Sequence, residues 1–106
     1  ACEAMGVGFR FHSGETGIAS AAYLQLSAAL EHVRGASQTL FHWYADDVID
    51  GGPFALENGV AQVPTGPGLG VTLDRKALKR CHDRYLAEGS FPSGRAGGYG
   101  SGFRKR

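Results

Sequence analysis

The sequence lacks the features of a membrane-spanning or disulfide-bonded protein. It has no apolar run as long as the roughly 18 residues that a transmembrane helix needs, and no apolar segment typical of a signal peptide. It has only 2 cysteines, which lie far apart and outside any Cys-x-x-Cys pattern. Neither a disulfide framework nor a zinc site is therefore indicated. We expect a cytoplasmic protein without membrane association whose thiols are free.

The sequence also has little net charge, +1 over 106 residues, so its overall balance does not indicate a nucleic-acid partner. Residues 90–106 form an exception, because this Gly-rich segment contains no acidic residue. We expect it to be disordered. Its aromatic residues Tyr99 and Phe103 stand among glycines between one cation and a run of three, so a weak RNA-contacting segment is an alternative to a solubilising tail. The four cations are Arg95, Arg104, Lys105 and Arg106.

The length fits one domain, and 42% hydrophobic residues allow a packed core. Ala1–Met5 resembles the end of a helix, terminated by Gly6 or Gly8. A natural chain seldom starts at the end of a helix, so we expect a fragment of a longer protein.

A strand, a helix and a second strand are predicted next. Val7–Phe11 is a short apolar strand that runs into His12. Apolar residues then recur every three to four positions over Gly17–Val33, which predicts a helix capped by Thr16 or Ser13. Thr39–Tyr44 is rich in aromatic residues and predicts a second strand. Two such strands in one sheet would form a right-handed parallel crossover.

Turns and one further helix are predicted after this unit. Asp50–Pro53 has turn chemistry, and Asn58-Gly59 predicts a hairpin within residues 54–63. Val71–Leu73 is a short extended piece. Asp74 is a good N-cap for a second helix, which Gly89 ends.

His12 is the first candidate for chemistry, because open α/β sheets and (β/α) barrels place functional groups where a strand ends before a helix. Histidine is a residue type that commonly serves in acid–base catalysis at physiological pH. The alternative is a solvated or capping histidine. One strand–helix–strand unit cannot cover both faces of a parallel sheet, so we expect more protein around this chain. His32 and His82 are expected to be inert on helix surfaces.

The order of segments resembles the C-terminal end of the enolase superfamily, and within it the mandelate racemase and glucarate dehydratase branch. The matching segments are HSGETGIASAAYLQLSAAL, then FHW, then FALENGVAQVPTGPGLGVTLD. The most specific part is Glu57–Asp74, and the resemblance covers about residues 1–89. It implies an α/β fold: the C-terminal strand–helix–strand of a modified (β/α)7β TIM-type barrel, followed by a hairpin and a helix of the capping domain.

The resemblance also implies boundaries within the chain. Residues 1–45 would be the C-terminal part of the barrel, residues 46–89 the return segment to the capping domain, and residues 90–106 the tail. Phe9–Phe11 would be the seventh barrel strand, Gly17–Val33 the seventh helix and Leu40–Trp43 the eighth strand.

The resemblance implies a role for each candidate site residue. His12 matches the general acid or base that acts at the carbon next to a carboxylate, where proton removal gives a metal-stabilised enediolate. Ser13, Glu15, His42 and Asp46 would bind substrate, with structural packing as the alternative for His42 and a simple turn for Asp46. The branch also places an acidic residue shortly after the His-Trp pair, and Asp46 and Asp47 follow that pair slightly late.

The implied activity is that of a metal-dependent acid-sugar dehydratase, a carbon–oxygen lyase. Its Mg²⁺ would be held by carboxylates on the third, fourth and fifth barrel strands, outside this chain, so the 106 residues alone would be inactive. The implied partners are a small carboxylate substrate, the rest of the barrel and cap, and further copies of the full-length protein. A racemase or cycloisomerase of the same superfamily is the alternative, as is a non-enzymatic RNA-contacting module that uses the basic tail.

Overall fold

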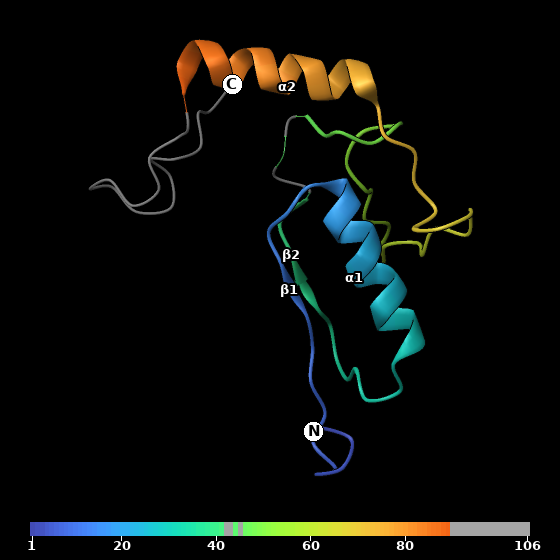
Figure 1. Cartoon of the computed structure of the whole chain (residues 1–106). Coiled ribbons are helices and arrows are strands. Elements are labelled where there is room, and N and C mark those ends of the chain that lie inside the picture. The colour runs from blue at the N-terminus through green and yellow to red at the C-terminus, as the bar shows by residue number, and fades with distance from the viewer. Residues whose placement is uncertain (42–43, 45, 90–106) are drawn as a thin grey trace.

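The computed structural model describes residues 1–41, 44 and 46–89, with two short strands and two helices. In chain order these are β1 (His12–Ser13), α1 (Gly17–Ala29), β2 (Gln38–Thr39) and α2 (Arg75–Glu88). Figure 1 shows α1 lying along the β1–β2 pair, and α2 apart from it, beyond the end where the chain passes from β1 into α1.

The strands pair in parallel, as the sequence predicted. His12 lies opposite Gln38 and Ser13 opposite Thr39. An isolated parallel bridge between Phe9 and Val33 extends the same alignment toward the N-terminus. Since α1 connects the two strands, the expected strand–helix–strand order is confirmed.

The predicted helix Gly17–Val33 is wrong at its C-terminal end, because α1 stops at Ala29 and Leu30 is extended. Val33 forms a bridge with Phe9, and the Arg34 N–H donates to the Phe9 carbonyl oxygen at 2.8 Å. A residue cannot take part in a strand bridge and keep a helical backbone. Tertiary pairing therefore ends a helix whose apolar spacing would allow a further turn.

The predicted strand and helix boundaries also differ from the structure near the N-terminus and after β2. Ala1–Met5 forms a hydrogen-bonded turn rather than a helix, because one turn without neighbouring turns is too short to be stable as a helix. The first strand pairs regularly at His12–Ser13, not over Val7–Phe11. The second ends at Thr39, and Phe41 turns inward, where it is buried with its ring 5.8 Å from that of Phe54. His42 and Trp43 of this predicted strand lie outside the described residues.

The predicted turns and the extended piece after residue 47 are confirmed, whereas the predicted hairpin within residues 54–63 is limited to its central turn, with no regular strand on either side. The Gly52 N–H donates to the Ile49 carbonyl oxygen at 3.1 Å, and Ile49 forms an antiparallel bridge with Leu73. Asn58 and Gly59 both have positive φ, 52° and 79°, in a tight turn closed by an antiparallel bridge between the flanking residues. Asn-Gly suits this backbone because both residues tolerate left-handed conformations.

The core is small. Its buried apolar side chains come from both helices and from the segments after β2, and they are Ala21, Phe41, Ile49 and Ala77. In contrast, α2 exposes a large apolar face, with Leu86 68% exposed and Leu78 and Tyr85 also exposed. The side chains of the described residues do not cover this face. No helix in this part of the chain is long and apolar enough to cross a membrane.

The predicted cap and end of α2 are confirmed. The Asp74 side chain accepts hydrogen bonds from the Lys76 and Ala77 N–H groups, and the Gly89 N–H donates to the Tyr85 carbonyl oxygen. These contacts satisfy backbone groups that a helix otherwise leaves unpaired at its ends. The basic tail of residues 90–106 lies outside the described residues.

We expect the first turn of α2 to loosen in acid. The Ala77 N–H, with further contributions from the Lys76 N–H and the Arg80 and Lys76 charges, lowers the pKa of Asp74 below its ordinary 3.8. Because the pKa of Asp74 is lower in the folded than in the unfolded state, the ionised side chain stabilises the folded state at pH values above the unfolded-state pKa. This contribution is lost as the pH falls through the folded-state pKa. The amide chemical shifts of Lys76 and Ala77 should therefore move together below about pH 4. Asp74→Asn should remove this titration, and an unchanged titration in that variant would contradict the assignment.

Candidate functional site

His12 lies in β1, immediately before the turn that leads into α1. Its backbone is fixed by the pairing with Gln38, and its side chain is exposed. Strand pairing therefore holds the backbone of His12 in place while its imidazole remains accessible. We call residues 12–17 the His12 turn.

Local hydrogen bonds shape the His12 turn. The Gly14 N–H donates to a carboxylate oxygen of Glu15 at 2.8 Å, and the Ser20 hydroxyl donates to the Glu15 carbonyl oxygen at 3.1 Å. The Glu15 residue is exposed at the surface, so its carboxylate combines a turn contact with access to solvent. Its predicted role in substrate binding stays a prediction.

A distant carboxylate, that of Asp47, caps the start of α1. Both Asp47 oxygens accept from the Gly17 N–H at 2.9 Å, and the Val48 N–H donates to Oδ1 at 2.6 Å. Thr16, one of the two predicted caps beside Ser13, does occupy the N-cap position, but its side chain makes no capping hydrogen bond. A negative charge at this end is favourable, since the first N–H groups of a helix carry a partial positive charge.

Tyr44 contacts the other end of the same turn. Its hydroxyl donates to the Gly14 carbonyl oxygen. Burial raises the pKa of Tyr44, and the nearby Glu15 and Asp47 carboxylates raise it further. The phenol therefore stays protonated at neutral pH and remains a hydrogen-bond donor. The segment after β2 thus contacts the His12 turn at Gly14 and at Gly17.

Asp46 connects this region to α2. Its carboxylate accepts from Arg80 at 3.2 Å and from Arg84 at 3.3 Å. It also accepts from the Asp47 N–H at 3.0 Å. The predicted substrate-binding residue is therefore already paired with two guanidinium groups, and its proposed contact with a substrate stays a prediction.

The remaining predicted substrate-binding residues are Ser13 and His42. Ser13 belongs to β1, next to His12, where its backbone pairs with Thr39. His42 lies outside the described residues. The structure therefore brings His12, Ser13 and Glu15 together in one turn, and it places Asp46 in the segment that contacts this turn.

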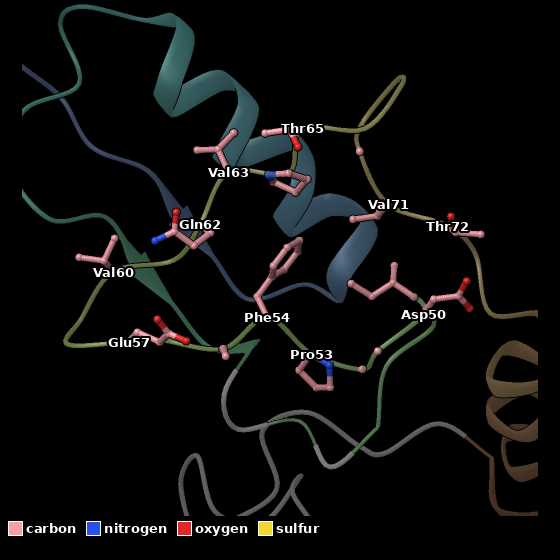
Figure 2. Close-up of a pocket in the computed structure, with 16 residues that line it drawn as sticks. Asp50, Pro53, Phe54, Glu57, Val60, Gln62, Val63, Thr65, Val71 and Thr72 are labelled. Carbon is pink, nitrogen blue, oxygen red and sulfur yellow. The ribbon is translucent and has the colours of Figure 1, made fainter.

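A cavity of about 620 Å³ lies elsewhere, between residues 49–57 and 60–72. Figure 2 shows the Phe54 ring in the middle of this hollow, between Val63 and Val71. None of residues 12–17 lines it. The titratable groups and the strand end coincide at the His12 turn, so we assign the candidate site there and not to the cavity.

No group of three or more histidine, cysteine, aspartate or glutamate side chains within the described ranges is arranged to hold a metal ion. The described residues thus do not fit a complete Mg²⁺ site. Both cysteines, Cys2 and Cys81, are free thiols.

Sequence reasoning did not identify Tyr44 and Asp47 as contacts of the His12 turn. Both contacts span 30 residues, so no local spacing indicates them. The only available signal was Asp47 as a polar residue after a predicted strand, which equally suits a simple turn.

Comparison with known proteins shows one consistent similarity. Residues 1–77 match the family described as enolase C-terminal domain-like. The chain is 35% identical over 86 residues to a curated Streptomyces coelicolor protein named probable glucarate dehydratase. This alignment covers 80% of the chain and 20% of the relative, so the chain spans about a fifth of that protein.

Solved structures agree. An isomerase from Streptomyces coelicolor A3(2) superposes with a TM-score of 0.76 at 39% identity, over 83% of this chain and 24% of that one. An enolase from Pseudomonas fluorescens Pf0-1, solved with magnesium, potassium and tartrate, superposes with a TM-score of 0.73 at 33% identity. This match covers 80% of this chain and 21% of that one. An enolase from Mycobacterium smegmatis, complexed with tartrate, superposes with a TM-score of 0.74 at 38% identity, over 80% of this chain and 21% of that one. From its sequence match and its fold, this chain belongs to the enolase C-terminal domain-like family.

Proposed function

We propose that this chain is the C-terminal part of a metal-dependent acid-sugar dehydratase of the enolase superfamily. The observation that carries the proposal is the exposed imidazole of His12 at the end of a parallel strand, in a chain that resembles a glucarate dehydratase. In this proposal residues 1–45 complete a (β/α)7β barrel. Residues 46–89 return to a capping domain.

The proposed role of His12 is to move a proton at the carbon next to the substrate carboxylate. An accessible imidazole on a fixed backbone suits this task, because histidine is a common general acid or base and proton transfer requires hydrogen-bond reach to the reacting atom. The hydroxyl group on the neighbouring carbon then takes up a proton and leaves as water, which completes the dehydration. Ser13, Glu15, His42 and Asp46 are proposed to bind the substrate, Ser13 and Glu15 through its hydroxyls.

Magnesium is present in solved relatives, including that from Pseudomonas fluorescens. The described residues of this chain supply no three-ligand cluster. As the family resemblance implies, we propose that the Mg²⁺ ligands of the intact protein are carboxylates on the third, fourth and fifth barrel strands.

The exposed apolar side chains support a larger protein around this chain. Met5, Tyr85 and Leu86 are all more than half exposed, and α2 presents an apolar face. Large exposed apolar surfaces of this kind usually mark an interface. In the proposal, the rest of the barrel and the capping domain cover them, and α2 belongs to the cap.

The function is tested with the intact protein, Mg²⁺ and acid sugars such as glucarate, followed by proton NMR in D₂O. We expect loss of water and appearance of a keto-acid product. Exchange of the α-proton without loss of water would indicate racemase activity in place of the proposed dehydratase activity. Absence of both dehydration and exchange across a panel of acid sugars would contradict the proposed activity.

A further inference from the structure

Asp47 is a buried carboxylate that the proposed reaction does not use. It is 2% exposed, in contrast to its half-buried neighbour Asp46. A buried carboxylate is unfavourable unless hydrogen bonds replace its lost hydration. Here the Gly17 and Val48 N–H groups provide them. The fold therefore maintains a buried charge at the point where the His12 turn enters α1.

The Gly17 N–H is paired through Asp47 and not through the adjacent Thr16 side chain. Gly17 is the first residue of α1, and its N–H is one of the groups that a helix leaves unpaired. The adjacent Thr16 side chain makes no capping bond. The backbone of Gly17 also approaches Asp47 closely, because a Cβ atom there would lie 3.1 Å from Asp47 Oδ1, a tight contact.

Titratable and charged groups surround Asp47 on several elements. The Tyr44 hydroxyl interacts electrostatically with both the Asp47 and the Glu15 carboxylates. The adjacent Asp46 is paired with Arg80 and Arg84. Tyr44 contacts Gly14 while Asp47 contacts Gly17. One short segment therefore holds both ends of the turn that follows His12.

We propose that Asp47 is a positioning residue that fixes the His12 turn through the Gly17 amide. Its carboxylate acts through the backbone and does not touch the substrate. The catalytic consequence of this role rests on the proposed function, whereas the structural role does not. A rigid turn would hold the imidazole at one distance from the reacting carbon, and small misplacements of a catalytic group greatly slow a reaction.

The first test is amide hydrogen exchange of the intact protein, followed by mass spectrometry of the peptide that contains Gly17. Asp47→Ala should speed exchange at the start of α1 by about tenfold. Asp47→Asn, which keeps the volume and one acceptor oxygen, should give a smaller increase and guards against misfolding of the alanine variant. Asp74→Ala is the matched control, because it removes the side-chain cap of α2 and should leave the Gly17 peptide unchanged.

The second test is steady-state kinetics at a temperature where every variant is folded. Asp47→Ala should lower kcat by about tenfold to a hundredfold with little change in KM, and Asp47→Asn should recover part of it. Asp74→Ala should keep the kcat of the original protein. A purely stabilising cap would instead lower Tm and leave kcat unchanged.

The two tests separate the positioning role from the proposed activity. Unchanged exchange at Gly17 in Asp47→Ala overturns the positioning role. Faster exchange with an unchanged kcat overturns its catalytic consequence. If the original protein has no activity, the proposed function fails, and hydrogen exchange still decides whether Asp47 holds the turn.

Discussion

Replacement of His12 by asparagine in the intact protein is expected to lower kcat by about 10² to 10⁴-fold, the usual contribution of a general acid or base. Asparagine retains hydrogen-bonding groups of similar reach but cannot take up and release a proton near neutral pH. Because the His12 side chain is exposed and its backbone pairs through β1, the substitution should leave the fold intact. The measurement is steady-state dehydration, with circular dichroism to verify the fold.

His82→Asn is the matched control for this prediction. His82 lies on α2 and is exposed like His12, but it belongs to no strand end. Its substitution should leave kcat unchanged. Full activity of the His12 variant would remove His12 from the mechanism, whereas equal losses in both variants would indicate a general effect on the protein.

Gly17→Ala is expected to destabilise the protein by about 1–3 kcal/mol, the usual cost of overpacking a core. A Cβ atom at this position would lie 2.4 Å from Ile49 Cδ1 and 2.6 Å from Ile49 Cγ1. Ile49 is only 4% exposed, so it has little room to move. Helix propensity favours alanine over glycine by at most about 1 kcal/mol, so we expect the steric cost to be larger. The measurement is the denaturant midpoint at constant m-value.

Two further variants test the steric cause. Gly14→Ala is the control, because its Cβ atom would meet Leu40 Cδ1 at an ordinary 3.5 Å. Its effect should be smaller than that of Gly17→Ala. Ile49→Ala removes both clashing atoms, so Gly17→Ala should cost less in that background than in the original protein. Additive costs would argue against a collision with Ile49.

Features set by nearby residues could be predicted from the sequence. The cap at Asp74 and the end of the second helix at Gly89 are confirmed, because both depend on backbone groups within four residues. The Asn58-Gly59 turn is confirmed for the same reason. The helix end at Ala29 and the short second strand were not predicted, because they depend on pairing with Phe9 and on burial of Phe41.

The candidate site divides in the same way. The sequence by itself determined that His12 lies where an extended segment passes through a Gly-containing turn into a helix, since hydrophobic spacing and turn residues are local signals. That His12 belongs to the paired strand itself was not predicted. Only the tertiary structure decided what holds that turn. Thr16 was a reasonable cap by its position, yet the hydrogen bonds come from Asp47 and Tyr44, 30 residues further along the chain. Which of several suitable oxygen atoms reaches an unpaired N–H group depends on how distant segments of the chain pack against each other. Local sequence does not determine this packing.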